Sequence, residues 1–287
     1  MTCPNSSSDR TIKKGFSLNI GGKKQRYICR DCGRKFSEQD ALDEAFPAVL
    51  FLDIETLPLK GYFWGPWQQD IRKEQIIADW SVLSWAAKWL GDSRMISDCL
   101  TPKEAVYRND HRIVQSMWKL MDEADVIIAQ NGKRFDIPKL NTRFWRYQMP
   151  QPSSYKVIDT LDAARRAFGV TYNSLDYLGE YLGAGRKIKT EFQLWIDCDL
   201  GDKKALADMQ AYNENDITLL ESVYLKMRGW IPGHPKFSAY AKVIGVCPVC
   251  MDADIKDVGL YTAVQKQYRE WRCENCGAVF HSTKAEK

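Results

Sequence analysis

Cysteine spacing constrains this 287-residue chain more than any other feature of its sequence. Cys247 and Cys250 form one C-x2-C pair, Cys273 and Cys276 form another, and 22 residues separate the two pairs. Each pair fits a tight turn that presents two thiolates to one tetrahedral Zn²⁺. Residues 240–287 are therefore predicted to form a four-cysteine zinc ribbon, with two disulfides or four unrelated thiols as the alternatives.

The same spacing recurs at the beginning of the chain. A shift of 244 positions superposes identical residues: Cys3 on Cys247, Pro4 on Pro248, Cys29 on Cys273, Cys32 on Cys276, Gly33 on Gly277 and Phe36 on Phe280. The position that corresponds to Cys250 is Ser6, and a neutral hydroxyl is a poor zinc ligand. Residues 1–40 are therefore expected to form a degenerate ribbon held by Cys3, Cys29 and Cys32. It could bind zinc weakly, borrow Asp9 or water as a ligand, or stand without metal.

Charge is unevenly distributed along the chain. Residues 1–40 carry a net charge of +5, residues 233–287 carry +2, and the middle carries −3. Basic ends suit a protein that holds a polyanion, although solvated surfaces often show similar imbalances. The cationic residues of the first module predict a phosphate-binding surface, with a solvated basic arm as the alternative: Lys13, Lys14, Lys23, Lys24, Arg26, Arg30, Arg34 and Lys35.

Apolar runs in the sequence are short. The longest purely apolar run, residues 48–52, falls far short of the roughly 20 residues that span a bilayer. The first ten residues are polar and carry no apolar signal core. In a chain without export signals, cysteines indicate metal ligands and buried thiols. We therefore expect a cytoplasmic protein without a membrane partner.

Strands and helices alternate in the central region, 44–232. Residues 47–53 form a near-continuous apolar run, as expected of a strand buried on both faces. Asp159 is predicted to cap the helix after its strand, and Asn173 or Ser174 the next helix. Strands are expected at 81–88, 94–99, 126–129 and 156–158, and helices at 108–123, 135–148, 161–168, 174–182 and 203–228. This order predicts an α/β domain whose sheet has parallel members and helices on its faces.

Acidic residues lie at the ends of these elements. Asp53 and Glu55 are two positions apart on the apolar strand, so both side chains leave the same face. After the strand at 126–129, Gly132 permits a tight turn, Phe135 is expected to anchor in the core, and Asp136 enters the next helix. A helix cap is the simpler interpretation of Asp136.

A third group of polar residues lies on the last helix of the central region. Tyr212 and Asp216 are four positions apart and so share one helical face. A strand end with two acids or a lone Y-x-x-x-D carries little information by itself. The carboxyl edge of parallel strands is, however, where α/β proteins place their sites.

In this order, the three groups resemble the motifs of the tyrosine-bearing (DEDDy, DnaQ-like) branch of the DEDD 3′→5′ exonucleases, which have an RNase H-like fold. The shared sequence motifs include Asp53-Ile-Glu55-Thr and Asn131-Gly-Lys-Arg-Phe-Asp136-Ile-Pro. In these motifs the chain resembles the proofreading domains of B-family DNA polymerases and stand-alone phage and bacterial RNase H-like exonucleases. The resemblance covers about 47–228 and implies an RNase H-like mixed sheet with flanking helices. The terminal zinc ribbons lie outside it.

This resemblance also implies the chemistry of the site. Asp53 is expected to bridge two Mg²⁺ or Mn²⁺ ions, Glu55 and Asp216 to complete the first, and Asp136 to hold the second. Hard oxygen ligands select these cations over Zn²⁺, and two of them can activate water and stabilise the leaving oxyanion. Tyr212 is expected to orient the attacking water, because a phenol with a pKa near 10 is a poor base at neutral pH.

Substrate contacts are predicted next to the second motif and in a later glycine-rich loop. The candidates, for which a solvated face is the alternative, are Asn131, Lys133, Arg134, Lys139, Arg143 and Arg146, followed by Arg186, Lys187 and Lys189. The expected partners are single-stranded 3′ ends and replication or repair proteins. DNA is favoured by the polymerase-like wording, and the compartment becomes the host cytoplasm if the protein is phage-encoded. An exoribonuclease, an RNase H-like endonuclease and a non-catalytic zinc-ribbon binding protein remain as alternatives.

Overall fold

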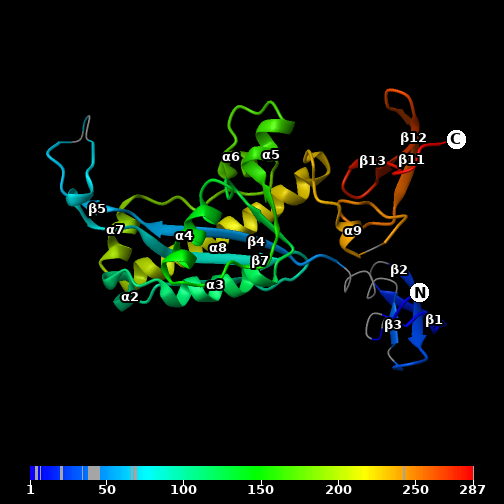
Figure 1. The fold of residues 1–287 in the computed structure, drawn as a ribbon, viewed down its shortest axis with the longest axis horizontal. Helices are drawn as coiled ribbons and strands as arrows, with labels where there is room; N and C mark the ends of the chain where they lie inside the picture. The colour runs from blue at the N-terminus through cyan, green and yellow to red at the C-terminus, as the bar shows by residue number, and fades with distance from the viewer. Residues whose placement is uncertain are drawn as a thin grey trace. The chain divides into compact units, whose positions relative to one another are not determined.

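The computed structural model describes residues 1–3, 6, 8–19, 22–33, 35–37, 46–65, 67, 70–241 and 243–286, with only the backbone for 14–19, 22–24 and 26. The chain separates into two compact units (Figure 1). One is Ala48–Met227, and the other comprises Met1–Pro47 and Arg228–Lys287. Among the residues with described positions, no helix has the length and apolar character needed to span a bilayer.

A five-stranded mixed sheet forms the centre of Ala48–Met227. Its order is β10-β9-β4-β7-β8, in which β4 pairs parallel with β9 and antiparallel with β7. Strand β9 also pairs parallel with β10. These pairings confirm the expected mixed sheet, whose strands are β4 (Val49–Leu57), β7 (Ser81–Trp89), β8 (Ile96–Cys99), β9 (Val126–Ala129) and β10 (Lys156–Asp159).

Strand β4 is buried on both faces, as its apolar run predicts. Leu50 and Leu52 are fully buried in the main core, and Phe51 packs edge-on against Tyr224 with ring centroids 5.6 Å apart. Residues two apart on a strand share a face. The side chain of Asp53 therefore leaves the same face of β4 as Phe51.

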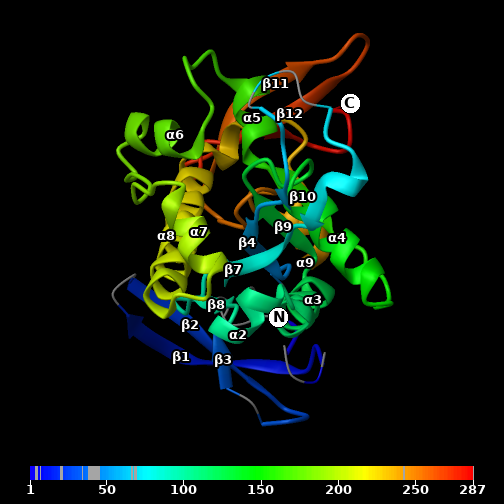
Figure 2. The same cartoon turned by 90° about the vertical axis from the view of Figure 1, so that its left-hand side faces the viewer.

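Helices cover both faces of this sheet (Figure 2). Helices α6, α7 and α8 lie on one side, with α8 packed on β4 and β7, while α3 lies on the other side with α4. The helices are α2 (Pro102–Tyr107), α3 (His111–Glu123), α4 (Asp136–Arg146), α5 (Thr160–Ala167), α6 (Leu175–Tyr181), α7 (Gln193–Asp199) and α8 (Lys203–Met227). The helix expected at 108–123 is α3, which begins three residues later, and neither α2 nor α7 was predicted.

Two predicted helix caps are confirmed, because Asp159 accepts hydrogen bonds from the first amides of α5 and Ser174 accepts one from the amide of Tyr177 in α6.

Beyond β4 the chain forms a small antiparallel sheet in which β5 (Lys60–Gly61) pairs with β6 (Ile76–Ala78). The 3-10 turn η1 (Lys73–Gln75) lies between these two strands in the sequence.

The terminal segments contain two three-stranded antiparallel sheets with the same strand order. The first has β1 (Thr11–Asn19), β2 (Gly22–Cys29) and β3 (Lys35–Ser37), and the second has β11 (Ile255–Thr262), β12 (Gln267–Cys273) and β13 (Val279–His281). The remaining elements are the 3-10 turn η2 (Arg228–Trp230) and the helix α9 (Phe237–Ala241).

Equivalent backbone bonds confirm the sequence repeat. The amide of Cys3 donates to Ser8 O and that of Cys247 donates to Asp252 O, both at 2.7 Å. Gly33 and Gly277 both donate to the carbonyl four residues earlier at 3.0 Å, with φ of 72° and 73°. Of the expected basic surface, Arg34 lies outside the described residues, as do the side chains of Lys14, Lys23, Lys24 and Arg26.

Candidate active site

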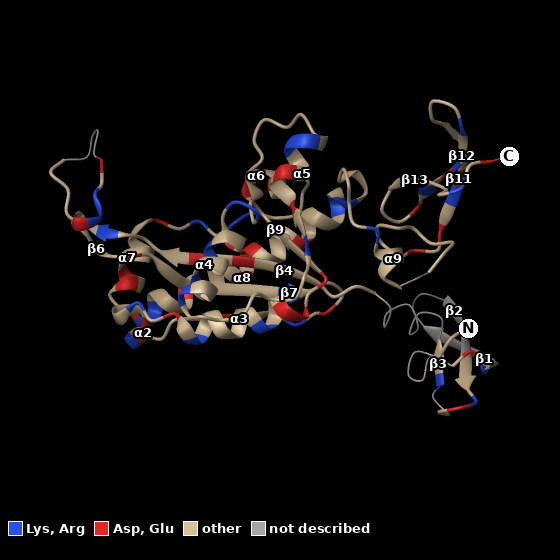
Figure 3. Ribbon diagram, in the orientation of Figure 1, with Lys and Arg blue, Asp and Glu red and all other residues tan. Residues whose placement is uncertain are grey.

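Strand β4 supplies two carboxylates where its parallel partner ends. Pairing with β9 reaches only Phe51, whereas pairing with β7 continues past Asp53 and Glu55. The register with β7 then shifts between Glu55 and Thr56, a bulge of the kind that is common beside active sites. Asp53 and Glu55 are the only charged residues of β4, and Figure 3 shows acidic positions on this strand.

Helix α8 brings further polar residues to the same place. Tyr212 and Asp216 are 8% and 1% exposed, which agrees with one shared face turned inward. The carboxylate oxygens of Asp53, Glu55 and Asp216 all lie within 4.8 Å of one another. Two chain segments about 160 residues apart therefore converge on one three-carboxylate group.

Burial and mutual repulsion disfavour the charged forms of these acids. Burial, followed by the charges of Asp136, Glu55 and Asp216, raises the pKa of Asp53 well above its usual range. Burial also raises the pKa of Glu55 to about 7, and the pKa of Asp216 is raised although Lys187 opposes the shift. Oδ1 of Asp216 is buried and has no hydrogen-bond partner within the described part of the chain. A bound cation would satisfy this oxygen and relieve the repulsion, so the donor set fits a divalent metal.

Asp136 stands beside this group and is held differently. Its Oδ1 accepts a hydrogen bond from the Ile54 amide at 3.0 Å, between the two acids of β4. Asp136 does not cap helix α4, which has no side-chain cap. Its carboxylate bonds to β4 instead, so the simpler interpretation of Asp136 as a helix cap is wrong. Burial raises the pKa of Asp136 to about 7.

The turn before Asp136 depends on two unusual backbone positions. Asn131 has a left-handed φ of 63°, and its amide donates to Asp159 Oδ1 at 3.0 Å. A Cβ on Gly132 would lie 2.4 Å from that of Ala129, so glycine is required by close packing rather than by a positive φ. Phe135, expected in the core, is 37% exposed, because the turn directs Asp136 inward instead.

Lys187 is the cation of this site. Its Nζ lies 2.6 Å from Asp216 Oδ2 and 5.0 Å from the ring centroid of Tyr212. Burial lowers the pKa of Lys187, but the charge of Asp216 and the hydrogen bonds with Asp216 and Tyr212 together outweigh burial, so the net shift is upward. A cavity of about 380 Å³ opens here and is lined by Asp176, Arg186, Lys187, Ile188, Lys189 and Tyr212.

Sequence reasoning missed three supporting residues. Asn213 donates to Asp53 Oδ2 at 2.5 Å and accepts from the Ser84 hydroxyl at 3.2 Å. A hydrogen bond from Trp195 lowers the pKa of Glu55 against the effect of burial. These contacts join residues that are far apart in the sequence, and no motif spacing marks them. The only sequence signal was that Asn213 directly follows Tyr212.

The predicted substrate contacts are placed unevenly. Arg134 is exposed, while Lys133 donates its amide to Asp159 and its Nζ lies 3.9 Å from Asp162. The Nζ of Lys139 lies 3.7 Å from the ring centroid of Trp80. Arg143 differs from the other candidates beside the second motif, because it is 4% exposed and paired with a fully buried acid, Asp110. That pair corrects the expectation of a substrate contact for Arg143 and gives it a structural role.

Both cysteine groups assemble as the repeat predicts. The four sulfurs of Cys247, Cys250, Cys273 and Cys276 lie within 4.8 Å of one another, as do those of Cys3, Cys29 and Cys32. Hydrogen bonds from Cys247 and Cys250 lower the pKa of Cys276 to about 2, which favours a thiolate. Four convergent thiol groups fit a tetrahedral metal site.

Comparison with known proteins gives a family match and likenesses to solved structures. Residues 94–228 match the family described as the RNase_H superfamily. The chain contains an RNase H-like domain. The matched segment includes Asp136 and Asp216 but begins after β4. Comparison with curated proteins gives no significant match.

A solved structure of the family B DNA polymerase from the hyperthermophilic archaeon Pyrobaculum calidifontis is similar in fold. The TM-score is 0.46 with 16% sequence identity, over 69% of this chain and 27% of the polymerase chain. This chain therefore covers about a quarter of that polymerase's length.

Proposed function

We propose that this protein is a metal-dependent 3′→5′ exonuclease that acts on single-stranded nucleic acid ends, with DNA as the favoured substrate. The observation that carries the proposal is the convergence of Asp53, Glu55 and Asp216 within 4.8 Å. Membership of residues 94–228 in the RNase_H superfamily supports nuclease chemistry. The sequences of the β4 and α4 motifs, which resemble those of polymerase proofreading domains, favour DNA as the substrate.

The acidic residues divide between two cation positions in this proposal. Asp53, Glu55 and Asp216 would hold one Mg²⁺ or Mn²⁺, and Asp53 with Asp136 would hold a second. Bound divalent cations make an attacking water more acidic and stabilise the leaving oxygen. Asn213, through its bond to Asp53, fixes the orientation of one ligand before any cation arrives.

Tyr212 and Lys187 act on water and phosphate. Burial raises the pKa of Tyr212 above its ordinary value of 10, so the phenol keeps its proton at neutral pH. Tyr212 therefore orients water by hydrogen bonding and does not act as a base. Lys187 neutralises Asp216 in the metal-free protein and lines the adjacent cavity, where its charge favours a phosphate.

Further substrate contacts come from residues around the acids. Lys189 is exposed at the cavity, and Lys133 and Arg134 are exposed beside the Asn131 turn. The backbone of Asn131 is fixed by Asp159, which leaves its side chain as a hydrogen-bonding group on a rigid turn. In this proposal they follow the backbone of a single strand, since phosphate contacts dominate affinity for nucleic acids.

We also propose that each terminal ribbon binds one Zn²⁺ and adds to the hold on nucleic acid. The second ribbon supplies four thiolates, and the first supplies three together with Ser6. The first module carries most of the excess positive charge of the chain, at +5. Zinc content per purified chain tests this part directly, with two equivalents expected.

Degradation of matched 5′-labelled DNA and RNA single strands with Mg²⁺ or Mn²⁺ tests the nuclease. A one-nucleotide ladder from DNA is expected, with loss of at least about 100-fold in rate for Asp53→Asn and Asp216→Asn. Asp208→Asn is the matched control, because Asp208 lies on the same helix in an exposed pair with Lys204. A ladder from RNA alone would assign the site to an exoribonuclease. Cutting of circular single strands would indicate an endonuclease, and binding without product a non-catalytic protein.

A further inference from the structure

A second cavity lies in the C-terminal segment, apart from the residues of the proposed nuclease site. Its volume is about 530 Å³, within the range of small-molecule sites. Helix α9 and the chain that follows it form one wall, and strands β12 and β13 form the other. The amide of Phe237, a fully buried residue, donates to Pro248 O at 2.7 Å and ties α9 to the chain that follows it within the first wall.

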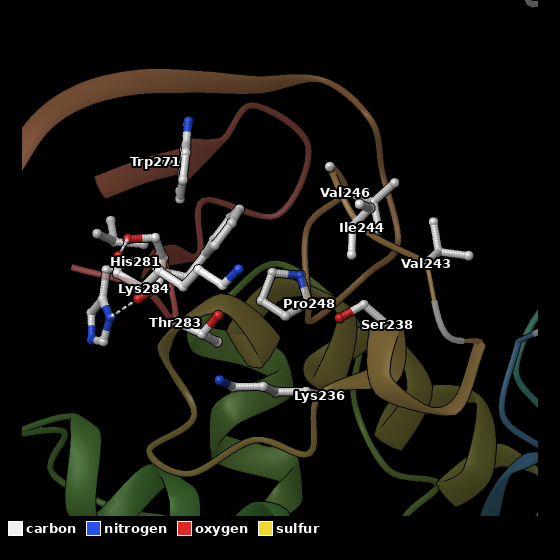
Figure 4. Close-up of a pocket in the computed structure, with 14 residues that line it drawn as sticks. Lys236, Ser238, Val243, Ile244, Val246, Pro248, Trp271, His281, Thr283 and Lys284 are labelled. Atoms are coloured by element: carbon white, nitrogen blue, oxygen red, sulfur yellow. Dashed lines mark hydrogen bonds between the residues drawn. The ribbon is translucent and has the colours of Figure 1, made fainter. Parts of the chain in front are cut away.

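The lining of this cavity combines aromatic surface with positive charge. Trp271 and Phe280 pack with ring centroids 5.9 Å apart, and both are half-buried. Figure 4 shows Trp271 on one side of the space and Lys236, Thr283 and Lys284 on the other. Lys236 and Lys284 are exposed, and no carboxylate is among the described residues that line the pocket.

The first ribbon provides an internal comparison. Its equivalent aromatic pair, Tyr27 and Phe36, has a similar centroid distance of 5.7 Å but is only 7% and 2% exposed. The pair is therefore part of the ribbon core in both modules, while the second module leaves part of it open. This opening is what turns a core contact into a surface for a planar ligand.

We propose that the pocket binds a nucleotide unit of single-stranded nucleic acid, with its base against Trp271 and its phosphate on Lys236 and Lys284. A base gains about 1–3 kcal/mol by stacking on an aromatic side chain, and lysines favour the phosphate. A purely apolar peptide would leave the two lysines and the hydroxyl of Thr283 without matching groups. The inference rests on the proposed function in one respect, the nucleic acid class of the ligand.

Binding without cleavage tests the pocket. Fluorescence anisotropy is measured in EDTA on full-length Asp53→Asn protein, with a labelled thymidine oligomer of about 15 nucleotides and a matched abasic oligomer. Adding Trp271→Ala should weaken binding of the thymidine oligomer about 5- to 100-fold, because the stacking contact between base and indole is lost. Binding of the abasic oligomer should be nearly unchanged, because that oligomer has no base to stack. Lys284→Glu should weaken both oligomers, whereas Lys266→Glu, an exposed lysine of the same ribbon outside the pocket, should weaken them less.

Equal thymidine affinity with and without Trp271, or equal losses for both oligomers, would overturn the proposal and leave the pocket for a protein segment. Zinc content and circular dichroism of each variant show whether the ribbon is still folded. Lys284 is exposed, so its substitution stays informative even if Trp271→Ala unfolds the ribbon. Because no cleavage is needed, failure of the pocket and failure of the nuclease give different results. Degradation that depends on Asp216 can persist without Trp271-dependent binding, and the reverse can also occur.

Discussion

Ser6 should make the first zinc site weaker than the second. In the second ribbon, Cys247 and Cys276 Sγ atoms are 3.6 Å apart, and those of Cys250 and Cys273 are 3.5 Å apart. In the first ribbon, the equivalent distances are 3.5 Å between Cys3 and Cys32 Sγ and 3.3 Å between Ser6 Oγ and Cys29 Sγ. The hydroxyl oxygen thus stands where a fourth sulfur belongs.

The magnitude follows from the loss of one ligand in four. Structural zinc sites bind with about 10–16 kcal/mol, so an average ligand contributes about 3 kcal/mol. A hydroxyl or water recovers part of this, which leaves a difference of about 1.5–3 kcal/mol, or about 10- to 150-fold in Kd. Ser6→Cys should recover this difference, and Cys250→Ser should impose it on the second ribbon.

Competition with a chromogenic chelator measures both sites in one titration. Wild type should lose one zinc ion at low chelator concentration and the other only at high concentration. Ser6→Cys should lose both ions only at high concentration, and Cys250→Ser should lose both at low concentration. Cys198→Ser, at a buried thiol outside both groups, is the control. Two equally tight zinc ions in wild type, or no tightening in Ser6→Cys, would refute the reasoning.

Three further predictions concern the RNase H-like domain. Lys187→Met should lower metal-free stability at neutral pH by about 1–3 kcal/mol, because it strands the buried Asp216, and denaturation in EDTA measures this. The pKa of Glu55 is raised from 4.5 to about 7, so the folded state binds more protons than the unfolded state in that interval. Loss of the Glu55 contribution should therefore lower the unfolding free energy in EDTA by about 3 kcal/mol as the pH rises from 4.5 to about 7. Asp136, whose pKa is also raised to about 7, adds to this fall, and a flat profile would contradict the shifts. Mg²⁺ should reduce this fall. Gly132→Ala should destabilise by about 1–3 kcal/mol through its clash with Ala129 and slow cleavage by displacing Asp136, whereas an unchanged melting temperature would contradict the tight packing.

Local chemistry made much of this fold predictable from the sequence. The apolar run of β4 predicted a strand buried on both faces, and Asp159 and Ser174 cap the helices that follow them. Strand alternation placed Asp53 with Glu55 on one face, and helical spacing placed Tyr212 with Asp216 on one face. Each of these signals lies within a few residues of its structural effect, whereas only the resemblance to the DEDDy exonucleases implied that the two pairs act together.

Features that depend on distant contacts were not predictable in this way. Arg143 has the spacing of an exposed helical face, yet Asp110, from another helix, draws it into a buried ion pair. Helix α7 begins at Gln193, and the preceding Phe192 provides no side-chain cap, so no start signal marks this helix. Phe135 was expected to be buried because it is apolar, but the turn at Asn131 and Gly132 gives the inward position to Asp136.

The ion pair between Lys187 and Asp216 bears on how the protein is made. Without a divalent cation, the folded unit Ala48–Met227 holds the acids of β4 and α8 within 4.8 Å of one another. With the ammonium group of Lys187 2.6 Å from Asp216, the chain supplies its own counter-charge in that state. Folding of this unit should therefore not require Mg²⁺ or Mn²⁺, and removal of these ions should leave it folded, whereas loss of zinc would act on the cysteine groups of the terminal segments.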